Sequence, residues 1–161
     1  GEGCTQCVVY VRVDGDDTHS GGSWAEALAS VQAGLDLAKT NGCEVWVAEG
    51  TYLPPPSTTD DPREASFRLD ASVRLYGGFA GTEWARDQRD FSEHVTTLSG
   101  DIGVADDPSD NSYHVISSAV GVEATLDGLT ITGGNANGDG SAGQGGGFYG
   151  TSALVVANST F

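Results

Sequence analysis

The sequence predicts an all-β protein, a solenoid of short strands with one capping α-helix near its N-terminus. Three similar phrases carry this prediction: Leu-Tyr-Gly at residues 75–77, Leu-Ser-Gly at 98–100 and Leu-Asp-Gly at 126–128. Each follows a β-prone run and precedes a polar, glycine-rich corner. Imperfect recurrence about once every 25 residues is typical of stacked repeats, whose units bury apolar surface only against their neighbours.

The first strand is predicted over residues 7–13. Val9, Val11 and Val13 alternate there with Tyr10 and Arg12, which is the period of two expected of a half-buried strand. Residues 14–22 are polar and rich in glycine, so they predict a loop.

The only helix is expected to begin at Ser23. Ser23 and Glu26 have the spacing of a capping box, and Asn41-Gly42 supplies a left-handed C-terminal cap. Apolar residues at helical spacing form one stripe: Trp24, Ala27, Leu28, Val31, Leu35 and Ala38. Such a helix would cover the open end of a stack of strands.

Further strands are predicted from short runs of β-branched and aromatic residues. They cover residues 44–48, 51–53, 67–69, 73–76, 96–99, 113–117, 124–126, 129–132, 148–149 and 154–157. Pro54, Pro55, Pro56 and Pro62 place a loop between the second and third of these strands. We expect residues 1–53 to form an N-terminal cap and residues 54–161 to form the coils. A β-sandwich is the structural alternative.

Composition narrows the function classes. The chain has 23 acidic residues against 7 basic ones, and its net charge of −16 disfavours nucleic acids and anionic membranes. No run approaches the roughly 20 apolar residues of a membrane span. The chain has no Met and ends on a β-like run. We therefore expect it to be processed or excised, as the N-terminal piece of a longer protein.

Three cysteines, Cys4, Cys7 and Cys43, are disulfide candidates. A disulfide from Cys4 or Cys7 to Cys43 would connect the first strand to the strand after the helix, provided that the protein is secreted. The alternative is a zinc site at Cys4-x-x-Cys7. It lacks a second Cys pair, and His19 is the only histidine nearby.

Calcium is the cofactor that the acidic residues favour, because hard cations take several oxygen ligands. Candidate ligands occur in three loops: Asp14, Asp16 and Asp17; Asp101, Asp106, Asp107 and Asp110; and Asn135, Asn137 and Asp139. The last set alternates like a calcium loop, with Gly140 for the turn, but Gly146 stands where an EF-hand has its final carboxylate.

No catalytic residue is assigned, because no nucleophile lies beside a base in any motif. The alternative is a calcium-dependent polysaccharide lyase or hydrolase. A lyase needs a base for the proton next to a uronate carboxylate and a cation to stabilise the resulting charge. Arg68 and Arg74 lie on predicted strands where they could face a groove.

An ordered series of segments resembles one protein family. The segments are 22–27, 45–52, 75–83, 89–90, 97–101, 112–116, 126–131 and 145–148. Together they look like the N-terminal region of bacterial right-handed parallel β-helix surface proteins. Those proteins have pectin-lyase-like architecture and are similar to polymorphic outer-membrane protein repeats. The resemblance implies a right-handed parallel β-helix at the cell surface or in the secreted fraction.

The function expected is therefore a non-catalytic, adhesin-like module of the matrix or envelope. Its partner would be a carbohydrate or a surface protein, and Trp46, Tyr76, Phe79 and Tyr149 are the candidates for stacking on sugars. A further alternative is a structural protein that assembles with itself through an open C-terminal coil, as in a filament or surface layer.

Overall fold

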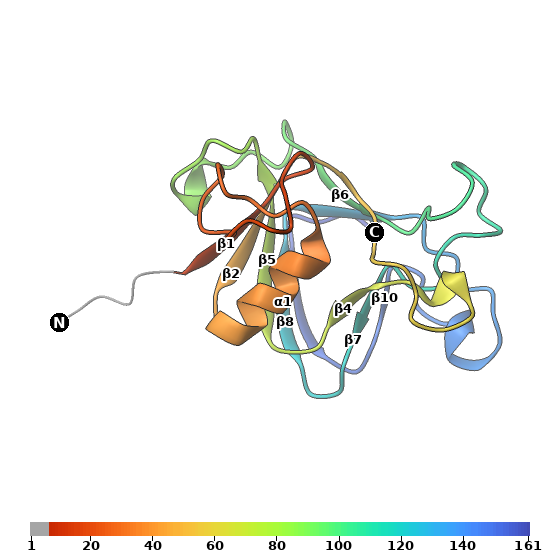
Figure 1. The fold of residues 1–161 in the computed structure, drawn as a ribbon. Helices are drawn as coiled ribbons and strands as arrows, with labels where there is room; N and C mark the ends of the chain where they lie inside the picture. Colours follow the sequence, from red (N-terminus) through yellow and green to blue (C-terminus); the bar gives the residue numbers. More distant parts are fainter. Residues whose placement is uncertain (1–6) are drawn as a thin grey trace.

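The computed structural model describes residues 7–161, which form three small parallel sheets and one α-helix (Figure 1). The largest sheet has the order β1 (Val8–Val11), β2 (Glu44–Ala48), β5 (Val73–Phe79), β8 (Glu123–Asp127) and β11 (Ala153–Ala157). The second sheet holds β3 (Gly50–Tyr52), β6 (Thr96–Ser99) and β9 (Leu129–Thr132). The third holds β10 (Phe148–Tyr149), β7 (Ile116–Ser118) and β4 (Phe67–Leu69).

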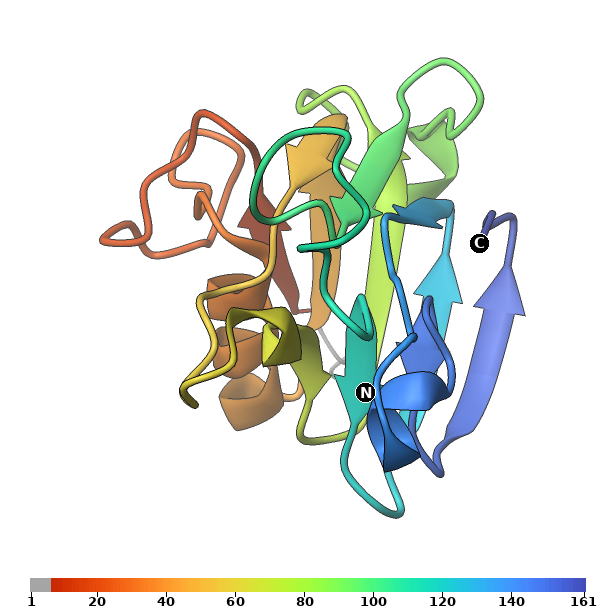
Figure 2. The same ribbon diagram turned by 90° about the vertical axis from the view of Figure 1, so that its right-hand side faces the viewer.

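Successive strands enter different sheets and return in register. Strands β2, β3 and β4 contribute one strand to each sheet, as do β5, β6 and β7, and then β8, β9 and β10. The strands of the largest sheet lie side by side from β1 to β11 in Figure 2. The register aligns Val9, Val45, Leu75 and Leu126 in one buried row, and Val156 of the last strand continues this row but is 42% exposed. The parallel register therefore stacks like residues and makes one apolar core.

The prediction of an all-β fold, a closed right-handed parallel β-helix, is wrong. Residues 7–161 form three separate small sheets together with a helix, in a mixed α/β-like arrangement, and no closed solenoid occurs among them. Strands of the second and third sheets are only two to four residues long. Long segments without strands, such as 80–95 and 100–115, interrupt the wall that a closed solenoid would need.

The helix α1 (Val31–Asn41) begins later than predicted. Its N-cap is Ser30, whose side chain accepts a hydrogen bond from the backbone of Ala33, and it ends as expected at Gly42 with φ 69°. Ser23 does bond the Glu26 amide, but only as a local turn. Leu28 then forms a parallel bridge with Val11, exchanging backbone hydrogen bonds with Tyr10 and Arg12. Pairing with β1 therefore uses the Leu28 backbone groups that a helix beginning at Ser23 would need for its own hydrogen bonds.

Helix α1 packs on the inner side of β1 and β2. Val31, Leu35 and Ala38 are buried in the same cluster as Val9 and Val45. The short distance between helix and sheet depends on Gly34, since a Cβ there would lie 2.6 Å from Cγ2 of Val11. Nearby, a disulfide joins Cys7 to Cys43 at the starts of β1 and β2. Of the two predicted pairings the structure contains this one, and Cys4 lies outside the described residues.

Three short 3₁₀ helices lie in the loops: η1 (Pro62–Glu64), η2 (Arg86–Gln88) and η3 (Gly140–Gly143). The loop of residues 80–95, which contains η2, folds over the outer side of the largest sheet. The Trp24 indole donates a hydrogen bond to the backbone oxygen of Glu83 and lies 5.7 Å from the Phe79 ring. The loop after β1 is thereby fastened to the loop after β5.

Candidate functional site

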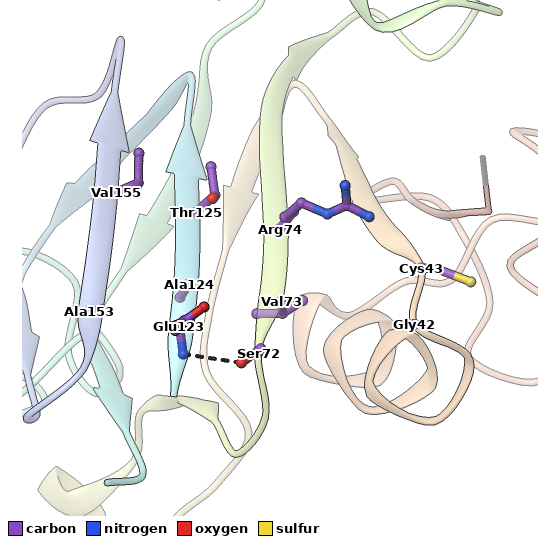
Figure 3. A pocket seen from close by; sticks show the side chains of 10 residues that line it. All are labelled: Gly42, Cys43, Ser72, Val73, Arg74, Glu123, Ala124, Thr125, Ala153 and Val155. Carbon is purple, nitrogen blue, oxygen red and sulfur yellow. Dashed lines mark hydrogen bonds between the residues drawn. The ribbon is translucent and has the colours of Figure 1, made fainter. Parts of the chain in front are cut away.

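A hollow of about 400 Å³ lies on the outer face of the largest sheet, across β5, β8 and β11 (Figure 3). Its lining consists of small, charged and hydroxyl-bearing residues rather than aromatic ones. These residues are Gly42, Cys43, Ser72, Val73, Arg74, Glu123, Ala124, Thr125, Ala153 and Val155.

Strand alternation puts the polar side chains on this outer face. On β5 the side chains of Val73 and Leu75 are buried, and Arg74 between them is exposed. On β8 the same alternation exposes Glu123 and leaves Thr125 half-buried. The parallel register makes Arg74 and Thr125 direct neighbours. The three groups are therefore held by rigid strands at fixed spacing.

The side chains of Arg74, Glu123 and Thr125 remain available to bind a ligand. The Ser72 hydroxyl accepts a bond from the Glu123 amide (3.1 Å), which fixes the turn before β8 (Figure 3). Within residues 7–161, however, the side chains of Arg74, Glu123 and Thr125 have no hydrogen-bond or ion-pair partner. A guanidinium, a carboxylate and a hydroxyl thus line one hollow, with Arg74 pointing toward its Cys43 side and Glu123 and Thr125 lying on the other side of β5 (Figure 3).

A second hollow of about 390 Å³ lies further along the same face of the sheet. It is lined by Tyr76, Arg86, Asp87, Arg89, Phe91 and Asp127. Tyr76 lies two residues beyond Arg74 on β5, and Asp127 lies two residues beyond Thr125 on β8, so both hollows open on the same face. We call the two hollows together the outer trough.

The arginines of the second hollow are engaged in ion pairs. Arg86 bonds the Glu44 carboxylate at 3.0 Å, and Glu44 is fully buried and also accepts from the Trp46 indole at 2.6 Å. Arg89 bonds Asp127 at 2.8 Å. Both guanidiniums lie over the Tyr76 ring, at 4.4 and 5.3 Å. These ion pairs and ring contacts hold this end of the trough in place.

The two arginines expected for lyase chemistry lie in different sheets. Arg68 is exposed on β4 in the third sheet, whereas Arg74 is exposed on β5 in the largest sheet. They therefore do not share a groove.

Three of the four predicted sugar-stacking residues form one buried cluster. Trp46 and Phe79 stack at 4.7 Å, and Tyr76 joins them beneath the arginines, so protein covers these rings. Tyr149 is 36% exposed and stacks on His114 at 4.6 Å, away from the trough. The partly exposed ring in the trough is Phe91. It lies in a loop with no periodic pattern, so no sequence signal distinguished it.

The first set of predicted calcium ligands is occupied by protein contacts. Asp14 bonds Arg12 at 2.6 Å, and this contact lowers the pKa of the Asp14 carboxyl. Asp16 accepts from the Thr18 hydroxyl and amide, which lowers its pKa as well. Asp17 accepts from the amides of Ala29 and Ser30. These carboxylates shape the loop before α1.

The remaining candidates lie in two loops that touch each other. Asp107 holds the Ser109 amide and hydroxyl, whereas Asp101 and Asp110 accept amides from within their own loop. Asn135 donates to the Pro108 carbonyl. The other two residues of the glycine-rich set do not join them: Asn137 accepts from Arg63, and Asp139 precedes η3 without capping it. Within residues 7–161 no group of three or more His, Cys, Asp and Glu side chains is placed to hold a metal ion.

Comparisons with known proteins assign no function to this site, so its function is inferred from the residues that line it. No helix among residues 7–161 has the length and apolar character needed to cross a bilayer. No family model matches the chain, and neither a curated protein nor a solved structure is significantly similar to it.

Proposed function

We propose that this chain is a non-catalytic extracellular binding module and that its outer trough takes a carbohydrate chain. The observation that carries the proposal is the side-by-side placement of Arg74, Glu123 and Thr125, without partners in residues 7–161, at the open part of the trough. Charged side chains of this kind form strong hydrogen bonds to paired hydroxyl groups.

The shape of the trough favours an extended ligand. Two residues along a strand span about 7 Å, so the second hollow lies one such step beyond the first. Phe91 adds an apolar surface at the far end, where a sugar ring could pack. Rigid strands and pre-formed ion pairs also keep the ordering cost of binding low.

Two features support a location outside the cell. A disulfide between Cys7 and Cys43 is stable in oxidising compartments. The net charge of −16 keeps such a module soluble and disfavours nucleic acids as partners. Both features suit a surface or matrix protein whose ligand is a polysaccharide.

The test is binding to a panel of immobilised polysaccharides, followed by calorimetry on those retained. We expect Arg74→Ala and Glu123→Gln each to weaken binding about tenfold, the effect of losing a charged hydrogen bond. Arg68→Ala is the matched control, because Arg68 is also an exposed strand arginine but lies on β4. Retention of no polysaccharide, or equal loss in the control, would contradict the proposal.

A second candidate function, association between copies of this chain, rests on β11. Strand β11 pairs with β8 on one side, and no strand within residues 7–161 pairs with its other side. The exposed apolar residues here are Val155 and Val156 on β11 itself and Phe161 after it. Such edges template pairing with another chain. Light scattering should then show a mass that grows with concentration and falls in Val156→Lys, whereas a constant monomer mass would exclude this function.

A further inference from the structure

Four buried oxygen atoms without hydrogen-bond partners belong to one loop. They are Oδ1 of Asp101, Oδ1 of Asp110, Oδ1 of Asn111 and Oγ of Ser112. No other buried side-chain nitrogen or oxygen in the described part of the chain lacks a partner. Ser112 is fully buried and Asn111 is 8% exposed. Solvent access therefore does not compensate these atoms.

The loop geometry turns both carboxylates inward. The Ser112 amide donates to the Gly100 carbonyl at 2.8 Å and closes the neck of the loop, so Asp101 lies across from Asn111. Oδ2 of Asp101 accepts from the Asp106 amide at 3.0 Å, and Oδ2 of Asp110 accepts from the Val104 amide at 2.7 Å. Those two amides are only two residues apart, so one short segment of the loop binds both carboxylates.

Two glycines, Gly103 and Gly100, allow close backbone packing in this loop. A Cβ at Gly103 would overlap the Asp110 carboxylate, so the backbone at this point packs directly against the acid group. Gly100 is similarly constrained, because a Cβ there would lie 2.6 Å from the Gly133 carbonyl oxygen. Gly103 thus allows the backbone to pack against the Asp110 carboxylate, and Gly100 allows the neck of the loop to pack against Gly133.

No cation among residues 7–161 neutralises the two carboxylates. Arg63 binds the outer side of this segment, donating to the carbonyls of Asn111 (2.7 Å) and Asn135 (2.8 Å) and lying over the Tyr113 ring. Within residues 7–161 neither Asp101 nor Asp110 forms a salt bridge. Two buried carboxylate oxygens without a cation are strongly unfavourable, which points to a bound positive ion.

We propose that the loop of residues 100–112 is a calcium site with Asp101, Asp110, Asn111 and Ser112 as its side-chain ligands. All four donors are oxygens and two carry charge, which suits a hard divalent cation rather than zinc or copper. Calcium fits better than magnesium, because side chains from an irregular loop do not impose octahedral geometry.

This site differs from the simple acidic cluster seen in the sequence. Asp107 is engaged with Ser109, and Asp106 serves through its amide at φ 63°. Neither belongs to the ligand set, whereas Asn111 and Ser112 do. The site is also independent of the outer trough, so either proposal can fail without the other.

The first experiment is calorimetry of chelator-treated protein titrated with calcium chloride, with terbium luminescence in parallel. We expect one ion per chain, and terbium emission excited through Tyr113, the neighbour of Ser112. Asp110→Asn should weaken binding at least about tenfold and Ser112→Ala less, since ligand charge sets affinity in such sites. Asp107→Asn, the matched control, should bind as the wild type does.

Thermal unfolding separates a ligand from a merely structural residue. In chelator, Asp110→Asn should melt no lower than the wild type, because the change removes a buried charge. With calcium added, the wild type should gain several degrees and Asp110→Asn should not. The proposal is overturned by absence of heat and of any melting shift at about 10 mM calcium, well above the affinity range of extracellular sites. Equal weakening in Asp107→Asn would also overturn it.

Discussion

Strands β2 and β11 have the same length and lie in the same sheet, yet their surroundings are opposite. All five residues of β2 are buried, whereas every residue of β11 is at least partly exposed. Helix α1 covers the inner side of β2, and the cluster of Trp24, Phe79 and Tyr10 covers its outer side. Among the strands of residues 7–161, β11 pairs with β8 alone. The difference shows that segments distant in sequence, rather than the strand itself, decide burial here.

The residue types of the two strands run against a simple hydrophobic rule. β2 contains Glu44, fully buried and held by Arg86 and the Trp46 indole, whereas β11 reads Ala-Leu-Val-Val-Ala. The more apolar strand is thus the less buried one. We expect stability to be concentrated at the β1–β2 end, and the following changes test that difference in order of decreasing effect.

Phe79→Ala should have the largest effect. Phe79 is fully buried and stacks on Trp46, and removing such a ring typically costs about 3–5 kcal/mol of unfolding free energy. Val155→Ala on β11 is the control, because Val155 is 61% exposed and should cost less than about 0.5 kcal/mol. Urea unfolding of both variants measures this, and similar losses would remove the contrast between the two ends.

Loss of the Cys7–Cys43 disulfide should rank next. The bond closes a loop over a sequence separation of 36 residues, and removing a cross-link of that size costs about 2–4 kcal/mol. The double variant Cys7→Ser/Cys43→Ser can be compared with the oxidised wild type by thermal unfolding. If its midpoint stays unchanged, the β1–β2 end does not depend on the bond.

Gly34→Leu should destabilise the helix–sheet contact. The new side chain would meet Val11 and Val45, and overpacking of this kind costs about 1–3 kcal/mol. Thr40→Leu, at an exposed position of the same helix, should leave stability within about 0.5 kcal/mol of the wild type. Denaturant titration of the pair checks the prediction, which fails when both variants behave alike.

The smallest effect is expected from His94. Its hydrogen bond to the Glu49 carboxylate, at 3.0 Å, raises the pKa of His94 above its usual value. The pair therefore adds its full stabilisation below about pH 6.5, and this is lost as pH rises through the raised pKa. Because the pair is exposed, the gain should be well under about 1 kcal/mol. An NMR titration should show the raised pKa and its disappearance in Glu49→Gln, and an ordinary value in the wild type would contradict it.

Local pattern predicted most of the strands but not how they assemble. The predicted ranges 44–48, 67–69, 96–99 and 129–132 coincide with β2, β4, β6 and β9. The helix start was misplaced because the Ser23–Glu26 capping pattern is satisfied by an isolated turn. The prediction of a closed solenoid failed because closure depends on the paths of long loops, and the sequences of these loops carry no periodic signal.

The candidate sites were less predictable than the strands. The sequence places Arg74 on a strand where it could face a groove, but its neighbours Glu123 and Thr125 come from another strand through the parallel register. The sequence indicates Asp101 and Asp110 as candidate calcium ligands. Asn111 and Ser112 become candidates only because the structure buries their oxygens without hydrogen-bond partners. Both sites depend on contacts between residues distant in sequence, which composition does not record.

The Cys7–Cys43 bond also bears on how the molecule would respond to a mechanical load. If the chain were stretched between its ends, force would pass directly from Cys7 to Cys43 and bypass the first loop, helix α1 and strand β1. The 36-residue separation would then contribute none of its extended length of about 120 Å. Under reducing conditions that hidden length would be released, so pulling on a single molecule would report the state of the bond as a longer extension.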